Sequence, residues 1–391
     1  MRSSNLGFIL LAVLALQSGT AKSEQKLTVN LGPTITVLES AIFPYMFLSR
    51  DGTLVVQGTV PRPPGSPLPE PSDFGGIPRT VRSTDGGKTW QVWKPGPKQG
   101  EGPTINNTPL QLKDGSILIF HWIAEYHRAG LAIGKRWISK DDWQTVTGPA
   151  ETRFDVPDGV GNGFGDNGLR YSTLWFDRSV LELPNGDLIA GCYGWFKQDT
   201  TPSEYQKTMN RFRCFIVRSK DRGLTWKYVA TVAVDPKVGQ EGFNESAIVH
   251  LAKGSRHGRL ICLMRVGRKN PLYQAYSDDE GKSWSKAEAL GLVGVDPDLI
   301  ELSDGTLVAS YGHKPDYKDD GNFLAFSFDQ GETWSQIVRL SSVPTSAYTS
   351  VRETAPGKLF VVYDERNPSD QPRLSQDRRI LGRVVELSAA K

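Results

Sequence analysis

The chain has 391 residues, of which 38% are hydrophobic, and it combines 40 glycines and 25 prolines with 10 tryptophans. This composition is typical of strands joined by tight turns rather than of long amphipathic helices. The formal net charge is only +3, with acidic and basic residues mixed along the chain. Such a dispersed balance gives no basis for a concentrated basic face, so nucleic acid is not an expected partner.

The first 21 residues are typical of a secretory signal peptide. Arg2 supplies a positive charge, Phe8 to Leu16 form an apolar run, and Gly19 to Ala21 offer small residues for cleavage. The apolar run is too short for a permanent transmembrane helix, which needs about 20 apolar residues. We therefore expect residues 1–21 to be removed and residues 22–391 to form one secreted domain without membrane insertion.

Two recurring signals divide the rest of the chain into six units. The first is a hairpin turn that leads into an apolar strand. Its copies are Asp51-Gly52, Asp114-Gly115, Asn185-Gly186 and Asp304-Gly305, with less perfect copies at Gly258 and Gly357. The segments Lys26 to Leu38 and Ile380 to Leu387 are also strand-like, and pairing these two ends would close a ring and remove its open edges.

The second signal has the pattern Ser-x-Asp-x-Gly-x-Thr-Trp. Its copies begin at Ser83, Ser219 and Ser327, with a Ser-for-Thr variant at Ser277 and a shortened copy at Ser139. Asp and Ser side chains bond nearby backbone N–H groups, Gly permits a positive φ, and Trp covers apolar area between sheets. The motif is therefore a folding element, and its acids are not catalytic candidates. Together the two signals predict an all-β fold, a six-bladed β-propeller in which each blade is a four-stranded antiparallel sheet.

Three cysteines, Cys192, Cys214 and Cys262, lie in apolar strand-like runs without metal-binding spacing. Buried free thiols are the expected state. A Cys192–Cys214 disulfide is the alternative, because export would permit it. No cofactor and no metal are predicted.

The boxes and their spacing resemble the Asp boxes of the sialidase superfamily over nearly the whole chain after residue 21. That resemblance implies a site at one mouth of the propeller channel, away from the boxes. The stretch Phe243 to Val249 places Glu245 at the start of an inner strand, and Arg265 closes the next strand. In this resemblance Glu245 is the general base and Arg265 binds a carboxylate of the substrate.

Further site residues follow from the same resemblance. Ala347-Tyr348-Thr349 is similar to the stretch that supplies a nucleophilic tyrosine, so Tyr348 is the implied nucleophile. Glu365 occupies the place of a Glu that orients a binding-site arginine. Asp73, in the Pro-rich segment 61–76, is the implied acid/base. A neutral phenol suits sialic acid, whose anomeric carboxylate would repel an Asp or Glu nucleophile, and a tyrosine nucleophile is an exception to the usual pair of carboxylates in glycosidases.

Proton transfer limits this mechanism. Reference pKa values make full transfer from a Tyr to a Glu uphill by roughly 8 kcal/mol. Glu245 would therefore have to accept the proton as the new bond forms, or Arg265 would have to stabilise the phenolate.

The resemblance fails at two of the three arginines that hold the substrate carboxylate in sialidases. Ile42 stands where the first is expected, and the stretch Tyr317 to Asn322, which includes Asp319 and Asp320, has no arginine for the third. Two lost charged hydrogen bonds would cost about 3–6 kcal/mol of binding. Lys314, Lys318, Arg352 and Arg366 are the cations that could compensate.

The leading hypothesis is a secreted, monomeric exo-α-sialidase-type glycosidase that hydrolyses a terminal acidic sugar of a glycan or glycoconjugate with retention. The missing arginines leave open a non-catalytic glycan-binding propeller. A third hypothesis is a uronate-directed hydrolase or lyase that uses His121 or His127. These histidines form with Glu125 a cluster that would suit a metal or acid–base site.

Overall fold

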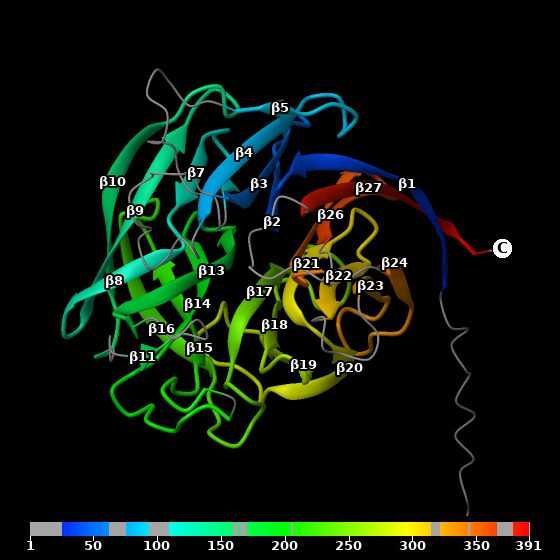
Figure 1. Cartoon of the computed structure of the whole chain (residues 1–391). Coiled ribbons are helices and arrows are strands. Elements are labelled where there is room, and N and C mark those ends of the chain that lie inside the picture. The colour runs from blue at the N-terminus through cyan, green and yellow to red at the C-terminus, as the bar shows by residue number, and fades with distance from the viewer. Residues whose placement is uncertain are drawn as a thin grey trace, which may run out of the picture.

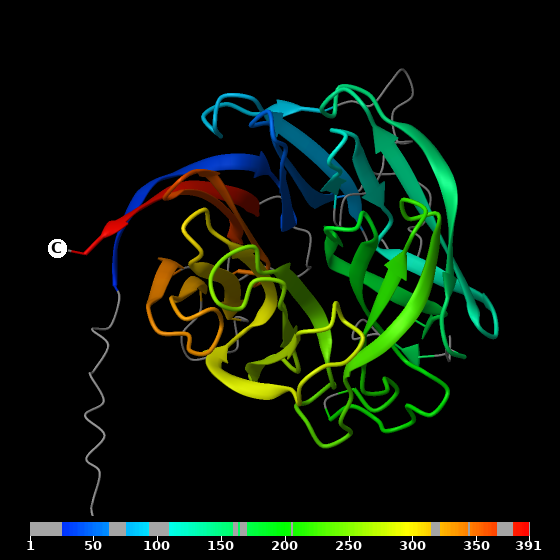
Figure 2. The ribbon, with the colours of Figure 1, turned by 180° about the vertical axis from the view of Figure 1, so that it is seen from behind.

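The computed structural model describes residues 26–61, 76–93, 109–158, 163–164, 170–204, 206–313, 321–342, 345–365 and 378–390. Within these ranges every helix or strand present is a β-strand, so the all-β prediction is confirmed. No helix that could span a membrane occurs in this part of the chain. Figures 1 and 2 show the sheets arranged around a common centre, with the first strands of neighbouring units in contact there.

Four of the sheets in the described ranges have four strands each, paired antiparallel. One contains β2 (Ile42–Leu48), β3 (Leu54–Pro61), β4 (Gly76–Ser83) and β5 (Gln91–Val92). A second contains β17 (Asn244–His250), β18 (Leu260–Arg265), β19 (Pro271–Ser277) and β20 (Glu288–Val293). A third contains β21 (Val295–Glu301), β22 (Leu307–His313), β23 (Gly321–Ser327) and β24 (Ile337–Ser341).

The fourth of these sheets joins the two ends of the chain. Its order is β25 (Thr349–Ala355), β26 (Lys358–Glu365), β27 (Arg379–Ala389) and β1 (Leu27–Glu39). The register pairs Leu38 with Ile380 and Leu31 with Val385. Figure 1 shows β1 and β27 side by side. The predicted pairing of the two ends is therefore confirmed, and it removes the open edge that each strand would otherwise present.

The second and third units share one nine-stranded sheet, so the expectation of separate antiparallel four-stranded sheets is wrong here. Its strands are β6 (Leu110–Gln111), β7 (Ile117–Phe120), β8 (Ile123–Arg128), β9 (Leu131–Ser139), β10 (Thr147–Asp155), β13 (Thr173–Glu182), β14 (Leu188–Gly194), β15 (Arg213–Ser219) and β16 (Thr225–Ala233). The extra strand β8 follows β7 closely, pairs with β9, and pairs through its other edge with β13. On the opposite side β10 pairs with β16 in parallel. These contacts satisfy backbone groups that separate sheets would leave at open edges. A short hairpin of β11 (Gly163–Phe164) and β12 (Arg170–Tyr171) lies outside this sheet.

The Asp boxes lie at the end of the ring opposite to Arg265. Ser277, which begins one box, pairs through β19 with Leu260, whereas Arg265 is the last residue of β18. Within this box Asp279 accepts hydrogen bonds from the Ser283 backbone at 2.9 Å, the Ser283 hydroxyl at 2.6 Å and the Ser277 hydroxyl at 2.8 Å. The motif is thus a turn that closes upon itself, as the sequence predicts.

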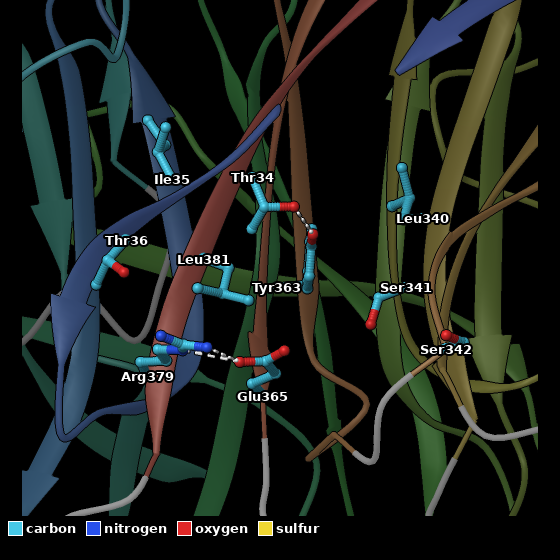
Figure 3. Close-up of a pocket in the computed structure, with 10 residues that line it drawn as sticks. All are labelled: Thr34, Ile35, Thr36, Leu340, Ser341, Ser342, Tyr363, Glu365, Arg379 and Leu381. Carbon is cyan, nitrogen blue, oxygen red and sulfur yellow. Dashed lines mark hydrogen bonds and ion pairs between the residues drawn. The ribbon is translucent and has the colours of Figure 1, made fainter. Parts of the chain in front are cut away.

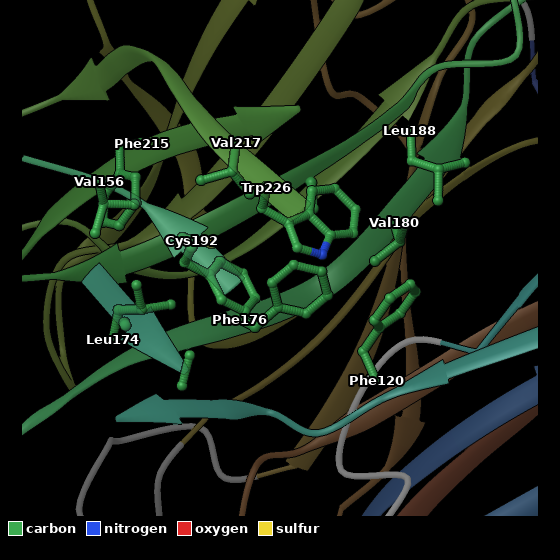
Figure 4. Close-up of a cluster of buried hydrophobic side chains, with 14 of the residues drawn as sticks. Phe120, Val156, Leu174, Phe176, Val180, Leu188, Cys192, Phe215, Val217 and Trp226 are labelled. Atoms are coloured by element: carbon green, nitrogen blue, oxygen red, sulfur yellow. The ribbon is translucent and has the colours of Figure 1, made fainter. Parts of the chain in front are cut away.

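The box tryptophans fill the space between neighbouring units. Trp226 is fully buried and stacks on Phe154, with ring centroids 6.1 Å apart. Phe120 and Phe176 meet Trp226 edge-on (Figure 4). Gly223 of the same box has a φ of 78°, and a Cβ there would lie 2.4 Å from the Phe120 ring. A glycine is required at this position by both the turn and the packing. The same cluster includes Cys192, and all three cysteines are buried free thiols, so the alternative of a Cys192–Cys214 disulfide is wrong.

The carboxylates of the Asp boxes make the stability of the fold depend on pH. Hydrogen bonds from Ser283, through its side chain and its backbone, lower the pKa of Asp279 from 3.8 to about 2. A carboxylate with a depressed folded-state pKa stabilises the fold above its unfolded pKa and loses that contribution as the pH falls through its folded pKa. We expect Asp279→Asn to reduce the free energy of unfolding by about 1 kcal/mol at pH 7, an exposed-site value. The penalty should shrink between pH 4 and pH 2.

Urea unfolding at pH 7 and pH 3 measures this penalty. Asp155→Asn makes the same chemical change at an exposed position outside the boxes and is expected to show little effect at either pH. A penalty for Asp279→Asn that stayed constant over this pH range would contradict the assignment.

Candidate active site

The first strands of several units begin with an irregular turn that directs one side chain toward the centre. Phe43, Glu245 and Asp296 have positive φ values of 58°, 34° and 48°. Each coincides with a register shift between the first and second strand of its sheet. Ala347, immediately before Tyr348, has a φ of 74°. Bulges re-aim side chains, and strained backbone of this kind gathers at functional sites.

Three of the residues predicted from the sequence meet at this centre. The Tyr348 hydroxyl donates a hydrogen bond to Oε1 of Glu245 at 2.6 Å. Nη1 of Arg265 donates to the same oxygen, also at 2.6 Å. On its other side Nε of Arg265 lies 2.6 Å from Oε1 of Glu241. The structure therefore places Arg265 between two carboxylates, one of which is the hydrogen-bond acceptor of Tyr348.

The charges of this cluster determine its protonation states. Burial and the adjacent Glu245 carboxylate raise the pKa of Tyr348 well above its usual value. Burial opposes the charged form of Arg265, but the carboxylates of Glu241 and Glu245 outweigh it and raise the pKa of Arg265. At neutral pH the cluster holds a neutral phenol and a charged guanidinium. A neutral phenol that already donates to a carboxylate can pass its proton to that carboxylate when it attacks an electrophile.

A second charged pair lies beside this cluster and was missed by the sequence reasoning. Arg178, on β13, forms a two-point ion pair with Asp296, and both side chains are almost fully buried. Arg178 also donates to the carbonyl of Thr349, the residue after Tyr348, and lies over the ring of Tyr45 at 4.5 Å. The pair therefore fixes the backbone next to the candidate nucleophile.

A repeat alignment offers a signal for these residues. Arg178-Ser179 and Glu245-Ser246 share the order charged residue then Ser, and Arg178 and Glu245 each lie within the register shift between the first and second strands of their units. The pairing of Arg178 with Asp296 cannot be seen in the sequence, because the two residues are 118 positions apart.

The structure brings Asp364 to the site and places Glu365 elsewhere. Asp364 is fully buried and accepts hydrogen bonds from the Thr345 hydroxyl at 2.6 Å, the Ser346 backbone at 2.7 Å and the Phe43 backbone at 3.1 Å. It thus ties the start of β2 to the segment that leads into Tyr348. Successive strand residues point to opposite faces, so a shift of one position separates the two acids.

Glu365 forms an ion pair with Arg379 at 2.8 Å (Figure 3). The pair lines a pocket of about 350 Å³ between β1, β24, β26 and β27, which also contains Tyr363 and Thr34. The sequence predicts that Glu365 orients a substrate-binding arginine. Its partner Arg379 instead lies on β27, away from the turns at the first strands that surround Tyr348.

The other sequence candidates have these positions. Asp73, Lys314, Lys318, Asp319, Asp320 and Arg366 lie outside the described residues. Arg352 bonds Asp298 at 2.6 Å. His121, Glu125 and His127 line a pocket of about 590 Å³ formed by β8, β9 and β10. In the described part of the chain no group of three His, Cys, Asp or Glu side chains is placed to hold a metal ion.

The sheets form a ring, with the Asp boxes at one end and the Tyr348–Glu245–Arg265 cluster at the centre. The chain has the Asp-box β-propeller fold of the sialidase superfamily. The BNR repeat-like domain family matches residues 177–361, and the BNR/Asp-box repeat matches residues 81–92.

Two curated relatives are similar to parts of the chain. Anhydrosialidase from Macrobdella decora is 28% identical over 146 residues, covering 33% of this chain and 17% of that protein. A sialidase from Micromonospora viridifaciens is 30% identical over 129 residues, covering 31% of this chain and 20% of that protein. The match thus spans a fifth or less of the length of these relatives.

Solved structures resemble the chain over most of its length. A protein of unknown function from Dyadobacter fermentans has a TM-score of 0.67 and 22% identity, covering 92% of this chain and 99% of that one. An alpha-L-arabinanase from Penicillium chrysogenum has a TM-score of 0.59 and 16% identity, covering 91% and 98%. At these identities the likeness shows the fold alone.

Proposed function

We propose that this protein is a retaining glycoside hydrolase in which Tyr348 is the nucleophile and Glu245 its general base. The observation that carries this proposal is the 2.6 Å hydrogen bond from the Tyr348 hydroxyl to Glu245, with Arg265 bound to the same carboxylate. The sialidase relatives support a glycosidase, and the turns that strain the backbone around Glu245 and Tyr348 support a preorganised site.

The reaction proceeds in two steps. Tyr348 Oη attacks the anomeric carbon while Glu245 accepts the phenolic proton, and the bond to the leaving oxygen breaks as an acid protonates it. Water then attacks the anomeric carbon and gives its proton to the conjugate base of that acid, while the glycosyl-tyrosine bond breaks and Glu245 returns the proton to Tyr348. Because full transfer of the proton to Glu245 is uphill by roughly 8 kcal/mol from reference pKa values, transfer accompanies bond formation. The positive charge of Arg265 lowers this barrier. Asp73 is the proposed acid/base.

The wider setting of this site is also a proposal. The sheets count as six blades, because the nine-stranded sheet contains two units, β6-β7-β9-β10 and β13-β14-β15-β16. Residues 1–21 act as a signal peptide, and the protein works as a secreted monomer on a glycan or glycoconjugate.

Two substrates are candidates for this site. A terminal acidic sugar of the sialic acid type is supported by the sialidase relatives and by the position of Arg265. A neutral terminal sugar is supported by the ion pairs in which Arg178 and Arg265 are already engaged. Either substrate suits the same two-step reaction, so the mechanism can be tested first.

Product stereochemistry tests the mechanism. The mature protein is incubated with aryl glycosides of sialic acid, glucuronic acid, galactose and arabinofuranose, and proton NMR follows the first product formed. We expect hydrolysis of at least one glycoside with retention of anomeric configuration. An inverted product, or no hydrolysis across the panel, would exclude the Tyr348 mechanism. An unsaturated uronate, recognised by its vinylic proton in the same NMR spectra, would instead identify a lyase.

A further inference from the structure

We propose that the sugar unit held against Tyr348 is uncharged, and that Glu241 and Phe43 make the site reject a sugar that carries a carboxylate. This inference rests on the proposed sugar site and concerns which class of sugar it accepts. It follows from the contacts of Arg178 and Arg265 and from the residues that stand where sialidases carry the first and third arginines.

Arg265 is already neutralised by the protein. Its side chain is 5% exposed, and it contacts the carboxylates of Glu241 and Glu245 at 2.6 Å each. The side chain of Glu241 is 3% exposed. A substrate carboxylate on Arg265 would be the third carboxylate around one buried guanidinium, and like charges at such distances repel strongly where water is scarce.

Arg178 is equally committed. Two of its nitrogen atoms face Asp296, a third donates to the Thr349 carbonyl, and the Tyr45 ring covers its face. Asp296 is also buried, so leaving Arg178 for a ligand would strand an unpaired carboxylate in the interior. Arg178 therefore serves as an internal partner, and its charge is not offered to a ligand.

Neither of the two remaining stretches at which sialidases carry arginine contains an arginine here. The Ile42 side chain is 2% exposed and packs in the core. Its neighbour Phe43 turns toward the centre instead, and its ring meets Tyr348 edge-on at a centroid distance of 4.7 Å. Asn322, at the end of the third stretch, is fully buried and lies 3.4 Å from the Thr345 hydroxyl.

Among the groups in these contacts, carboxylates outnumber guanidinium groups. Two guanidinium groups, of Arg178 and Arg265, face three carboxylates, of Glu241, Glu245 and Asp296. A fourth carboxylate, Asp364, lies behind Phe43. The carboxylate of an anionic sugar would find both of these guanidinium groups already paired with protein carboxylates. An uncharged sugar would instead donate its hydroxyls to Glu245 and lay its apolar face on Phe43 and Tyr45, both of which are partly exposed.

Matched pairs of substrates test the inference on the unmodified protein. Each pair differs only in the carboxylate: aryl glucoside against aryl glucuronide, and the methyl ester of an aryl sialoside against its free acid. We expect the uncharged member of any pair that is hydrolysed to have a kcat/KM at least about tenfold higher. Preference for the acid in either pair would overturn the inference and leave the proposed hydrolase function standing.

A glycan array decides the case in which no pair is hydrolysed. Labelled protein that binds neutral termini, and neither sialylated nor uronate termini, would support the inference while the hydrolase proposal fails. Binding to acidic termini, or to no glycan at all, would overturn it.

A charge variant tests the role of Glu241. Glu241→Gln keeps the size of the side chain and removes one negative charge beside Arg265. We expect the relative kcat/KM for the acidic member of a hydrolysed pair, or its relative array binding, to rise about tenfold. Glu386→Gln makes the same change at a side chain that is 63% exposed on β27 and should leave the ratio unchanged. An unchanged ratio in a folded Glu241→Gln protein would overturn the role assigned to Glu241.

Discussion

Replacing Tyr348 with Phe is expected to lower kcat/KM by about a thousandfold or more on any glycoside that the protein hydrolyses. The change removes the attacking oxygen and the hydrogen bond to Glu245, but it keeps the ring that meets Phe43. Loss of activity would therefore report the hydroxyl rather than the packing. Steady-state kinetics, with a thermal melt to verify folding, measures the effect.

Tyr363→Phe is the matched control. Tyr363 lies one strand further out, is 2% exposed, and its hydroxyl is 3.3 Å from that of Thr34. The Tyr363→Phe variant also loses a phenolic oxygen, but that oxygen does not contact Glu245. We therefore expect its kcat/KM to stay within about threefold of that of the unmodified protein. A Tyr348→Phe protein with full activity would refute the nucleophile assignment.

Removing one partner of the Arg178–Asp296 pair should be the most destabilising single change at the site. Both side chains are almost fully buried, at 5% and 2% exposure. Arg178→Met leaves Asp296 charged and unpaired, and breaking a buried pair in this way costs about 3–5 kcal/mol of unfolding free energy. Urea unfolding monitored by tryptophan fluorescence measures the loss.

Two further variants separate the stranded charge from other causes. Asp296→Asn added to Arg178→Met removes the stranded charge and suits the positive φ at this position, so we expect it to recover about half of the lost stability. Arg222→Met breaks an exposed pair with Asp114, at 49% and 51% exposure, and should cost less than about 1 kcal/mol. Equal losses for Arg178→Met and Arg222→Met would contradict the buried-pair argument.

Activity should not follow stability in the double variant. Arg178 bonds the carbonyl next to Tyr348, and neither Met nor Asn replaces that contact. We expect kcat to remain low even where the free energy of unfolding recovers. Such a split between the two measurements distinguishes a positioning residue from a purely structural one.

The sequence alone determined the features that depend on local chemistry. The hairpin turns and Asp boxes depend on side chains within a few residues of one another, as the bonds from Ser277 and Ser283 to Asp279 show. Their repetition predicts the sheets, and the alternating end segments predict the closure of β1 on β27. Tyr348, Glu245 and Arg265 were also identified, because the resemblance to sialidases is carried by short stretches around them.

Tertiary structure decided the features that arise between units. The extra strand β8 and the parallel pairing of β10 with β16 merge two units into one sheet, which no repeat pattern indicates. The strand alternation decided that Asp364, and not Glu365, meets the segment before Tyr348. Above all, Glu241 and Asp296 reach the two arginines only through the folded ring. A charge in a sequence has no partner until folding supplies one, and here the partners acquired by Arg178 and Arg265 determine the electrostatic character of the site.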